Sequence, residues 1–253
     1  MSELALDGKV ALVTGGSRGL GRAMATAFAE AGADVIIASR KLDSVEQAAT
    51  EIAEETGRRV TGFAAHVGDW EQCTELISKS VALTGKLDVL VNNAGMAPLY
   101  PHLHEASEEL FDKTIAVNLK GPFRLASLAA HHMASTGGGS IINISSVAAM
   151  RPTQHEVPYG AAKAGVHVLT AGIALGYGPT VRANTIMAGP FLTDISAAWD
   201  MAAFDEFAAS MPLRRGGQPD EITGAALYFA SDASRFTTGA LLRVDGGQAL
   251  VRR

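Results

Sequence analysis

Short apolar runs alternate with stretches of helical periodicity along this chain of 253 residues. Such alternation is typical of βαβ units, in which helices connect the strands of a parallel sheet. Several runs are apolar without polar alternation, as strands covered on both faces should be. The expected strands span 9–13, 34–38, 59–64, 87–91, 140–145, 181–187 and 240–244. The pattern predicts an α/β fold with a doubly wound parallel sheet.

The chain gives no sign of a division into several domains. No Pro- or Ser-rich linker and no block of charge interrupts it, and the glycine run at 137–139 is too short for a linker. Ser44 with Gln47, and Asp69 with Gln72, resemble capping boxes that begin helices. We therefore expect one domain over residues 1–253.

The composition argues against several classes of protein. The net charge of -5, without a basic block, disfavours nucleic acid as a partner. No apolar run approaches the ~18 residues of a membrane-spanning helix, and no spacing of metal ligands stands out, so we expect neither a membrane nor a metal site. Cys73 is the only cysteine, which fits the reducing cytoplasm.

A glycine-rich loop follows the first expected strand. Residues 14–21 read TGGSRGLG and lead into an apolar helix. Glycines let the backbone approach a pyrophosphate closely, and the helix N-terminus presents free N–H groups to it. A tight strand-to-helix turn without a ligand is the alternative interpretation. The position between a first strand and a first helix favours a nucleotide.

The end of the second strand indicates which dinucleotide is bound. Enzymes that select NAD usually carry an acidic residue about 20 residues past the loop, where it bonds the ribose 2′-hydroxyl. This chain has Ser39 followed by Arg40. A guanidinium suits a 2′-phosphate, and Arg18 in the loop offers a second one. The pattern favours NADP(H) over NAD(H), unless both arginines are merely solvated.

Tyr159 and Lys163 lie four residues apart, so on a helix they share one face. A free tyrosine, with a pKa near ~10, is a poor acid or base at neutral pH. A neighbouring cation favours the phenolate and lowers that pKa, which suits proton exchange with an alcohol oxygen. Many helix surfaces carry such a pair by chance, so the pair needs support from the rest of the chain.

That support comes from an ordered set of motifs that resembles the classical short-chain dehydrogenase/reductase family. Residues 14–21 match its TGxxxGxG loop, 92–95 its NNAG motif and 244–247 its VDGG motif. Asn118 matches a mid-helix asparagine, and Ser146 stands 13 residues before the tyrosine. The resemblance covers nearly the whole chain. It implies a Rossmann fold whose seven-stranded sheet has the order 3-2-1-4-5-6-7.

The resemblance also implies catalytic roles. Tyr159 would be the general acid in ketone reduction and the base in alcohol oxidation, while Lys163 would lower its pKa and bond the nicotinamide ribose. Ser146 would bond the substrate carbonyl, and Asn118 would hold a helix kink and a water on a proton path. Without a catalytic role, Ser146 would simply end a strand, and Asn118 would hydrogen-bond the backbone of its own helix.

Cofactor residues follow from the same resemblance. The expected set is Gly15, Ser17, Arg18, Gly19, Leu20, Gly21, Ser39, Arg40, His66, Val67, Asn92, Ala94, Gly95, Tyr159, Lys163, Gly189 and Thr193. Two departures stand out. His66-Val67 replaces the usual Asp-Val near the adenine, and Ala188-Gly189-Pro190 replaces the usual Pro-Gly above the nicotinamide.

Substrate specificity in this family comes from three irregular segments, here 96–105, 147–158 and a lid over 191–213. The lid carries Trp199, Met201, Phe204, Phe207 and Met211, which suit an apolar substrate or pack the lid against its own protein. Arg151 or His155 is suited to a carboxylate or phosphate, or is simply exposed.

Two enzymatic interpretations stay open, and both take a small-molecule carbonyl or alcohol substrate. One is an NADPH-dependent carbonyl reductase, with the 3-oxoacyl thioester reductases included. The other is a polyol, sugar-acid or secondary-alcohol dehydrogenase, which polar pocket side chains would favour. A third interpretation is a cofactor-binding protein without catalysis, against which the intact Ser146, Tyr159 and Lys163 argue. The resemblance further implies a homo-oligomer, either a dimer or a homotetramer.

Overall fold

The structure is a computed structural model that describes residues 3–194, 196 and 200–251. Seven strands form one parallel sheet in the order β3-β2-β1-β4-β5-β6-β7, which confirms the predicted order. Each strand lies within two residues of its expected position. The strands are β1 (Val10–Thr14), β2 (Asp34–Ser39), β3 (Val60–Ala64), β4 (Val89–Asn92), β5 (Gly139–Ser146), β6 (Val181–Ala188) and β7 (Leu241–Val244).

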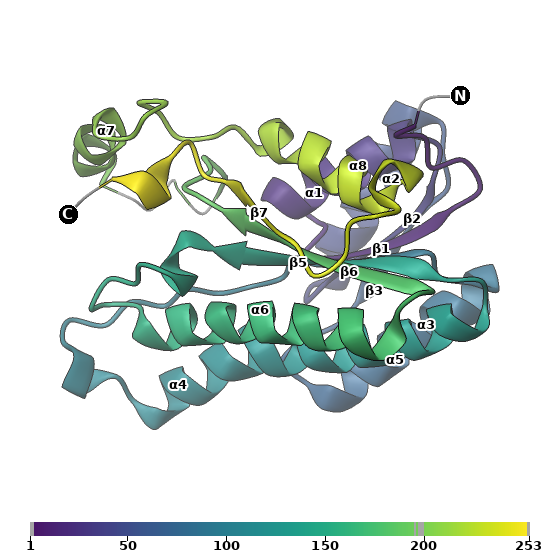
Figure 1. Cartoon of the computed structure of the whole chain (residues 1–253), viewed down its shortest axis with the longest axis horizontal. Coiled ribbons are helices and arrows are strands. Elements are labelled where there is room, and N and C mark those ends of the chain that lie inside the picture. Colours follow the sequence, from purple (N-terminus) through teal and green to yellow (C-terminus); the bar gives the residue numbers. More distant parts are fainter. Residues whose placement is uncertain (1–2, 195, 197–199, 252–253) are drawn as a thin grey trace.

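Helices cover both faces of the sheet (Figure 1). One face carries α1 (Gly19–Glu30), α2 (Leu42–Thr56) and α8 (Thr223–Ala230). The other carries α3 (Trp70–Thr84), α4 (Glu108–Ile115), α5 (Gly121–Ser135) and α6 (Val157–Tyr177). The short helix α7 (Met201–Ala209) lies at one end of the molecule beside the C-terminal turn (Figure 1). Within the described residues, no helix is both long and apolar enough to cross a membrane.

The first strand shows why its sequence lacks polar alternation. Val13 packs into the core on the α1 side, and Leu12 packs into the core on the α3 and α5 side. Both side chains are fully buried. Each burial of this size is worth roughly 1.5–3 kcal/mol, so both faces of the strand select apolar residues.

The expected helix starts were correct at one position and wrong at another. The Asp69 carboxylate accepts the Gln72 backbone N–H at 2.9 Å and caps α3, as predicted. Ser44 does not cap α2, because that helix already begins at Leu42, and Lys41 at its N-cap makes no side-chain cap. Strand β2 ends at Ser39, so the chain enters α2 earlier than the capping pattern indicates.

Candidate active site

The glycine-rich loop leaves its backbone open at the start of α1. Arg18 occupies the N-cap without a capping side chain, and the helix begins at Gly19. Gly15 and Gly19 adopt φ of 66° and 54°, a left-handed conformation that favours glycine. A Cβ on Gly21 would collide with the Gly15 carbonyl oxygen. The uncapped helix end and the side-chain-free cradle fit the pyrophosphate of a dinucleotide.

Asn93 secures this loop, a role that the sequence analysis missed. Its Nδ2 donates to the Thr14 carbonyl at 2.8 Å, while the Thr14 hydroxyl accepts the Asn93 and Ala94 N–H groups at 3.0 and 3.1 Å. The same hydroxyl donates to the Val91 carbonyl at 3.1 Å. These bonds tie the end of β1 to the turn after β4. The NNAG motif marked this turn, but not which asparagine side chain faces the loop.

Asn92 lies in the interior. Its Nδ2 donates to Asn143 Oδ1 at 2.9 Å and to the Pro122 carbonyl at 3.3 Å, which links β4 to β5 and α5. Its Oδ1 is buried and has no hydrogen-bond partner within the described part of the chain. Gly95 lies nearer the catalytic residues, since a Cβ there would stand 2.9 Å from Asn118 Oδ1 and 3.6 Å from Lys163 Nζ.

The residues expected to select the cofactor lie near the loop and the ends of β2 and β3. Arg18 and Arg40 are exposed, and neither forms an ion pair with a described residue. Ser39 is partly buried at the end of β2. His66 is exposed just beyond β3, where its Nδ1 accepts the Gly68 N–H at 3.2 Å, and Val67 is buried. A 2′-phosphate would meet positive charge here.

Tyr159 and Lys163 share one face of α6, as predicted, with Nζ 5.7 Å from the ring centroid. Ser146 ends β5 and lies within hydrogen-bonding reach of the tyrosine. Tyr100 fixes the start of this helix, because its hydroxyl accepts the Val157 N–H at 2.9 Å. This contact, which no sequence pattern predicts, joins the segment 96–105 to the residues just before Tyr159.

The electrostatics of the pair differ from the expectation. Burial raises the pKa of Tyr159, while the hydrogen bond from Ser146 lowers it and the charge of Glu156 raises it further. Lys163 is 4% exposed, its Nζ donates to the Ile144 carbonyl at 2.9 Å, and burial lowers its pKa to about 8. The expected lowering of the tyrosine pKa by Lys163 is therefore absent in the free protein, where burial is the larger effect.

Asn118 holds an irregular turn between α4 and α5. Residues Ala116–Lys120 form a π-helical turn, and the fully buried Asn118 lies within it. Its Nδ2 donates to the carbonyls of Met96 and Thr114 at 2.8 and 2.9 Å, and its Oδ1 accepts the Met96 N–H at 3.2 Å. The expected kink is present, and the contact with the helix's own backbone is present as well.

Gly189 and Thr193 follow β6. The Gly189 N–H donates to the Val244 carbonyl at 3.0 Å, and a Cβ on this glycine would collide with Asp245. Thr193 lies close to the phosphate loop, since a Cβ on Gly19 would stand 3.4 Å from its side chain. The start of the expected lid thus reaches the loop. The lid position Trp199 lies outside the described residues.

The structure brings the predicted catalytic residues together at the carboxyl ends of the strands. A hydroxyl, a phenol and an ammonium lie beside a cradle that fits a dinucleotide, an arrangement suited to proton exchange with a carbonyl oxygen next to a hydride donor. Among the described residues, no three His, Cys, Asp or Glu side chains form a group that could hold a metal.

Comparisons with known proteins agree with this arrangement. The family model described as enoyl-(acyl carrier protein) reductase matches residues 15–249. An uncharacterised oxidoreductase of Mycobacterium tuberculosis is 43% identical over 96% of this chain and 92% of its own length. D-threitol dehydrogenase of Mycolicibacterium smegmatis is 37% identical over 97% of this chain and 94% of its own.

Among solved structures, a gluconate 5-dehydrogenase from Burkholderia cenocepacia, in complex with NADP and tartrate, is 36% identical with a TM-score of 0.93. The match covers 99% of this chain and 98% of that one. Fold and site together define a nicotinamide-dependent oxidoreductase of the Rossmann type that interconverts ketones and secondary alcohols. The chain belongs to the short-chain dehydrogenase/reductase family.

Proposed function

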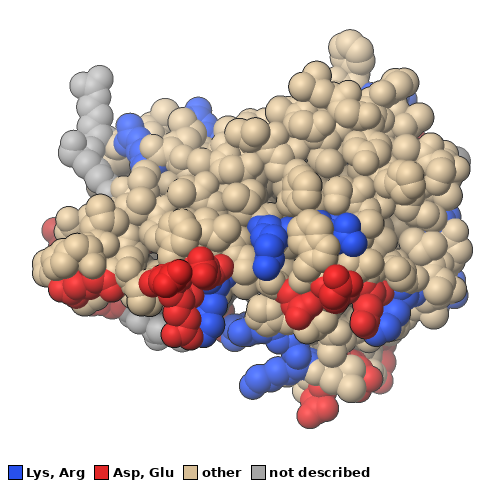
Figure 2. Space-filling view, turned by 90° about the horizontal axis from the view of Figure 1, so that it is seen from below, with Lys and Arg blue, Asp and Glu red and all other residues tan. Residues whose placement is uncertain are grey.

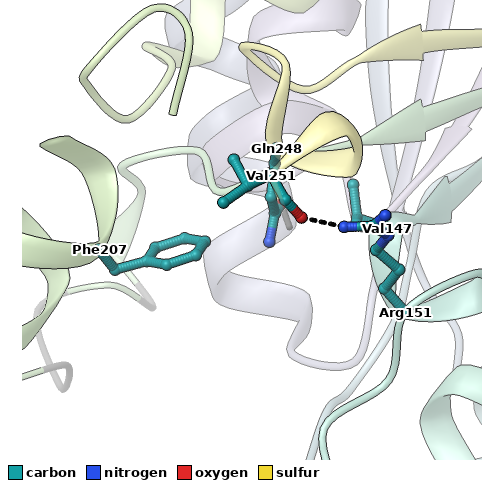
Figure 3. Close-up of a pocket in the computed structure, with 5 residues that line it drawn as sticks. All are labelled: Val147, Arg151, Phe207, Gln248 and Val251. Carbon is teal, nitrogen blue, oxygen red and sulfur yellow. Dashed lines mark hydrogen bonds between the residues drawn. The ribbon is translucent and has the colours of Figure 1, made fainter. Parts of the chain in front are cut away.

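We propose that the substrate of this enzyme is a small hydroxylated molecule: a sugar, a polyol or a sugar acid. The main support is a pocket that begins at Val147, directly after Ser146 (Figure 3). Its other lining residues are Arg151, Phe207, Gln248 and Val251. Arg151 and Gln248 offer hydrogen-bond donors that suit hydroxyl and carboxylate oxygens. The similarity to D-threitol and gluconate dehydrogenases supports the same substrate class.

The proposed roles follow from the contacts. Tyr159 gives its proton to the substrate oxygen in reduction and takes it back in oxidation, while Ser146 holds that oxygen in place. Lys163, with a pKa of about 8, can gain and lose a proton near neutral pH. Through its hydrogen bonds to the Met96 backbone, Asn118 holds the π-helical turn and residue 96 in position. The nicotinamide cofactor, when bound, supplies or accepts the hydride.

A panel of substrates tests the proposal. The loss of nicotinamide absorbance is followed with NADPH for a keto sugar, a simple diketone and an acetoacetyl thioester. We expect the highest kcat/KM on the keto sugar. Turnover of the thioester alone would instead assign the enzyme to the 3-oxoacyl thioester reductases, and turnover of the diketone alone to the general carbonyl reductases.

We also propose that the enzyme prefers NADP(H). The exposed guanidiniums of Arg18 and Arg40, with no ion-pair partner among the described residues, support this preference. A hydrogen bond to a charged group is worth about 1.5–3 kcal/mol, so Arg40→Asp should lower kcat/KM for NADPH roughly 10- to 100-fold. Arg235→Asp, at a distant exposed site, controls for the change of charge. A wild-type preference for NADH would contradict the assignment.

We infer a single domain over 1–253 with 191–213 as a lid, in the cytoplasm, where the free, buried Cys73 would stay reduced. Helix α6 supports a homo-oligomer, a dimer or a homotetramer, because Val168 and Leu175 are exposed and Lys163 is its one charged residue. On the side of the molecule that carries this helix, Figure 2 shows a wide area without charged side chains.

A further inference from the structure

Arg151 is held at a fixed place relative to Ser146. The short helical turn Val147–Ala149 begins directly after Ser146, whose hydroxyl accepts the Ala148 N–H at 3.2 Å. The backbone N–H of Arg151 donates to the Val147 carbonyl at 2.9 Å and closes this turn. One short, hydrogen-bonded piece of backbone thus carries both Ser146, which is proposed to hold the reacting oxygen, and Arg151 with its guanidinium.

The guanidinium of Arg151 has a single hydrogen-bond partner within the described part of the chain, the Val251 carbonyl oxygen (Figure 3). No described carboxylate pairs with it. A guanidinium has five N–H donors, and its planar fork matches the two oxygens of a carboxylate. Arg151 is exposed, and a neutral carbonyl occupies only part of its fork, so the remaining donors are open to solvent and to a ligand.

The rest of the pocket suits a small polar group. Its enclosed part has a volume of about 20 Å³, which is room for one small polar group such as a carboxylate and not for a whole substrate. Phe207 points from α7 toward Gln248 and Val251, so an apolar ring forms one side of the pocket (Figure 3). Gln248 carries both a donor and an acceptor, which suits a hydroxyl group next to the anion.

We propose that Arg151 binds the carboxylate of an open-chain sugar acid, and that it makes this enzyme select such acids over neutral polyols of the same length. This inference rests on the proposed function, since it names one substrate class within it. In the free enzyme the Val251 carbonyl holds the guanidinium toward the pocket. An entering carboxylate replaces the Val251 carbonyl and accepts two parallel hydrogen bonds from the guanidinium.

The test uses D-gluconate and D-glucitol, which share a carbon chain and differ at one end, where a carboxylate replaces an alcohol. With NADP⁺, the wild type should oxidise gluconate with the higher kcat/KM. Arg151→Gln should lower that value roughly 10- to 100-fold, mainly through KM, and change it less than about threefold for glucitol. Arg151→Lys, which keeps the charge without the fork, should retain part of the difference. Arg235→Gln is the matched control.

Each contrary result has its own meaning. Equal losses of kcat/KM on gluconate and glucitol in Arg151→Gln would overturn the carboxylate contact and leave the polyol assignment standing. A wild-type preference for glucitol would have the same meaning. A preference for glucitol 6-phosphate over gluconate would assign the guanidinium to a phosphate ester instead. If the wild type oxidised none of the three but reduced the diketone or thioester, the proposed function would fail, and this inference with it.

Discussion

Two regions of the molecule meet at the proposed substrate site, and they are built differently. The floor comprises the proposed catalytic residues Asn118, Ser146, Tyr159 and Lys163 on β5, α6 and the π-helical turn. The rim comprises residues 96–105, residues 147–151, the proposed lid and the C-terminal residues 248–251. Floor residues are buried or partly buried, whereas the rim exposes large apolar side chains such as Leu99, Met150 and Leu213.

Beneath the floor, buried polar side chains form one connected network. Asn143 Nδ2 donates to Thr170 Oγ1 at 2.9 Å, and Thr170 shares a 2.7 Å hydrogen bond with Thr185. Asn143 also accepts from Asn92, so the network crosses β4, β5, α6 and β6. Only Asn92 Oδ1 in this network lacks a partner among the described residues, and a buried network so nearly complete restricts its groups to few arrangements. The floor is therefore suited to a constant reaction, and the rim to a substrate that differs between enzymes.

The largest expected effect comes from removing the phenol of the floor. General acid–base catalysis contributes about 100- to 10,000-fold, so Tyr159→Phe should lower kcat by that factor. The dissociation constant for NADPH, measured by fluorescence titration, should change much less, because the variant removes at most one expected cofactor contact and leaves the phosphate cradle intact.

Tyr177→Phe provides the matched control. It removes a phenol near the end of the same helix, where the hydroxyl makes no hydrogen bond to a described residue, and it should retain wild-type activity. Full activity of Tyr159→Phe would transfer the proton chemistry to another residue. It would also remove the distinction between floor and rim.

The next largest expected effect is on the pH dependence of stability and comes from the buried ammonium of Lys163. The pKa of Lys163 is about 8 in the folded protein and ordinarily 10.5. Between these values the unfolded chain binds more protons, so stability rises as the pH rises through this window. Relative to Lys163→Met, the wild type should gain about 2 kcal/mol in free energy of unfolding between pH 7.5 and pH 10. Chemical denaturation at several pH values measures this gain.

Lys79→Met controls for the loss of an exposed lysine on α3. Its pH dependence relative to the wild type shows what charge removal alone produces. If the Lys163→Met difference stayed as flat as the control, the ammonium would not be held in a desolvated site. The floor would then be as open to water as the rim.

Half of the floor could be predicted from local information, because the four-residue spacing of Tyr159 and Lys163 places both on one helix face. Ser146 and Asn118 were assigned through the family resemblance, since the strand pattern alone does not choose between Ser145 and Ser146. The pKa values could not be predicted in the same way. They depend on burial, which only the packed fold produces, and for Tyr159 also on the hydrogen bond with Ser146 and the charge of Glu156.

The rim was harder to predict because its contacts join distant parts of the chain. Tyr100 bonds the start of α6 at a separation of 57 residues, and Arg151 meets Val251 at a separation of 100. No periodicity or motif marks such pairs. From the sequence, Arg151 fits either a ligand contact or a solvated position, and in the structure it is exposed and lines one side of a small pocket.

The smallest expected effect tests the apolar side of the rim. Phe207 lines the pocket from α7, so Phe207→Ala should raise KM for the preferred substrate about three- to tenfold and leave kcat nearly unchanged. Met201→Ala, on the same helix but away from the pocket lining, should leave both constants unchanged. Steady-state kinetics with saturating cofactor separates the two constants. A fall in kcat comparable to that of Tyr159→Phe would mean that lid and chemistry are coupled, and that the rim helps to position the reacting atoms.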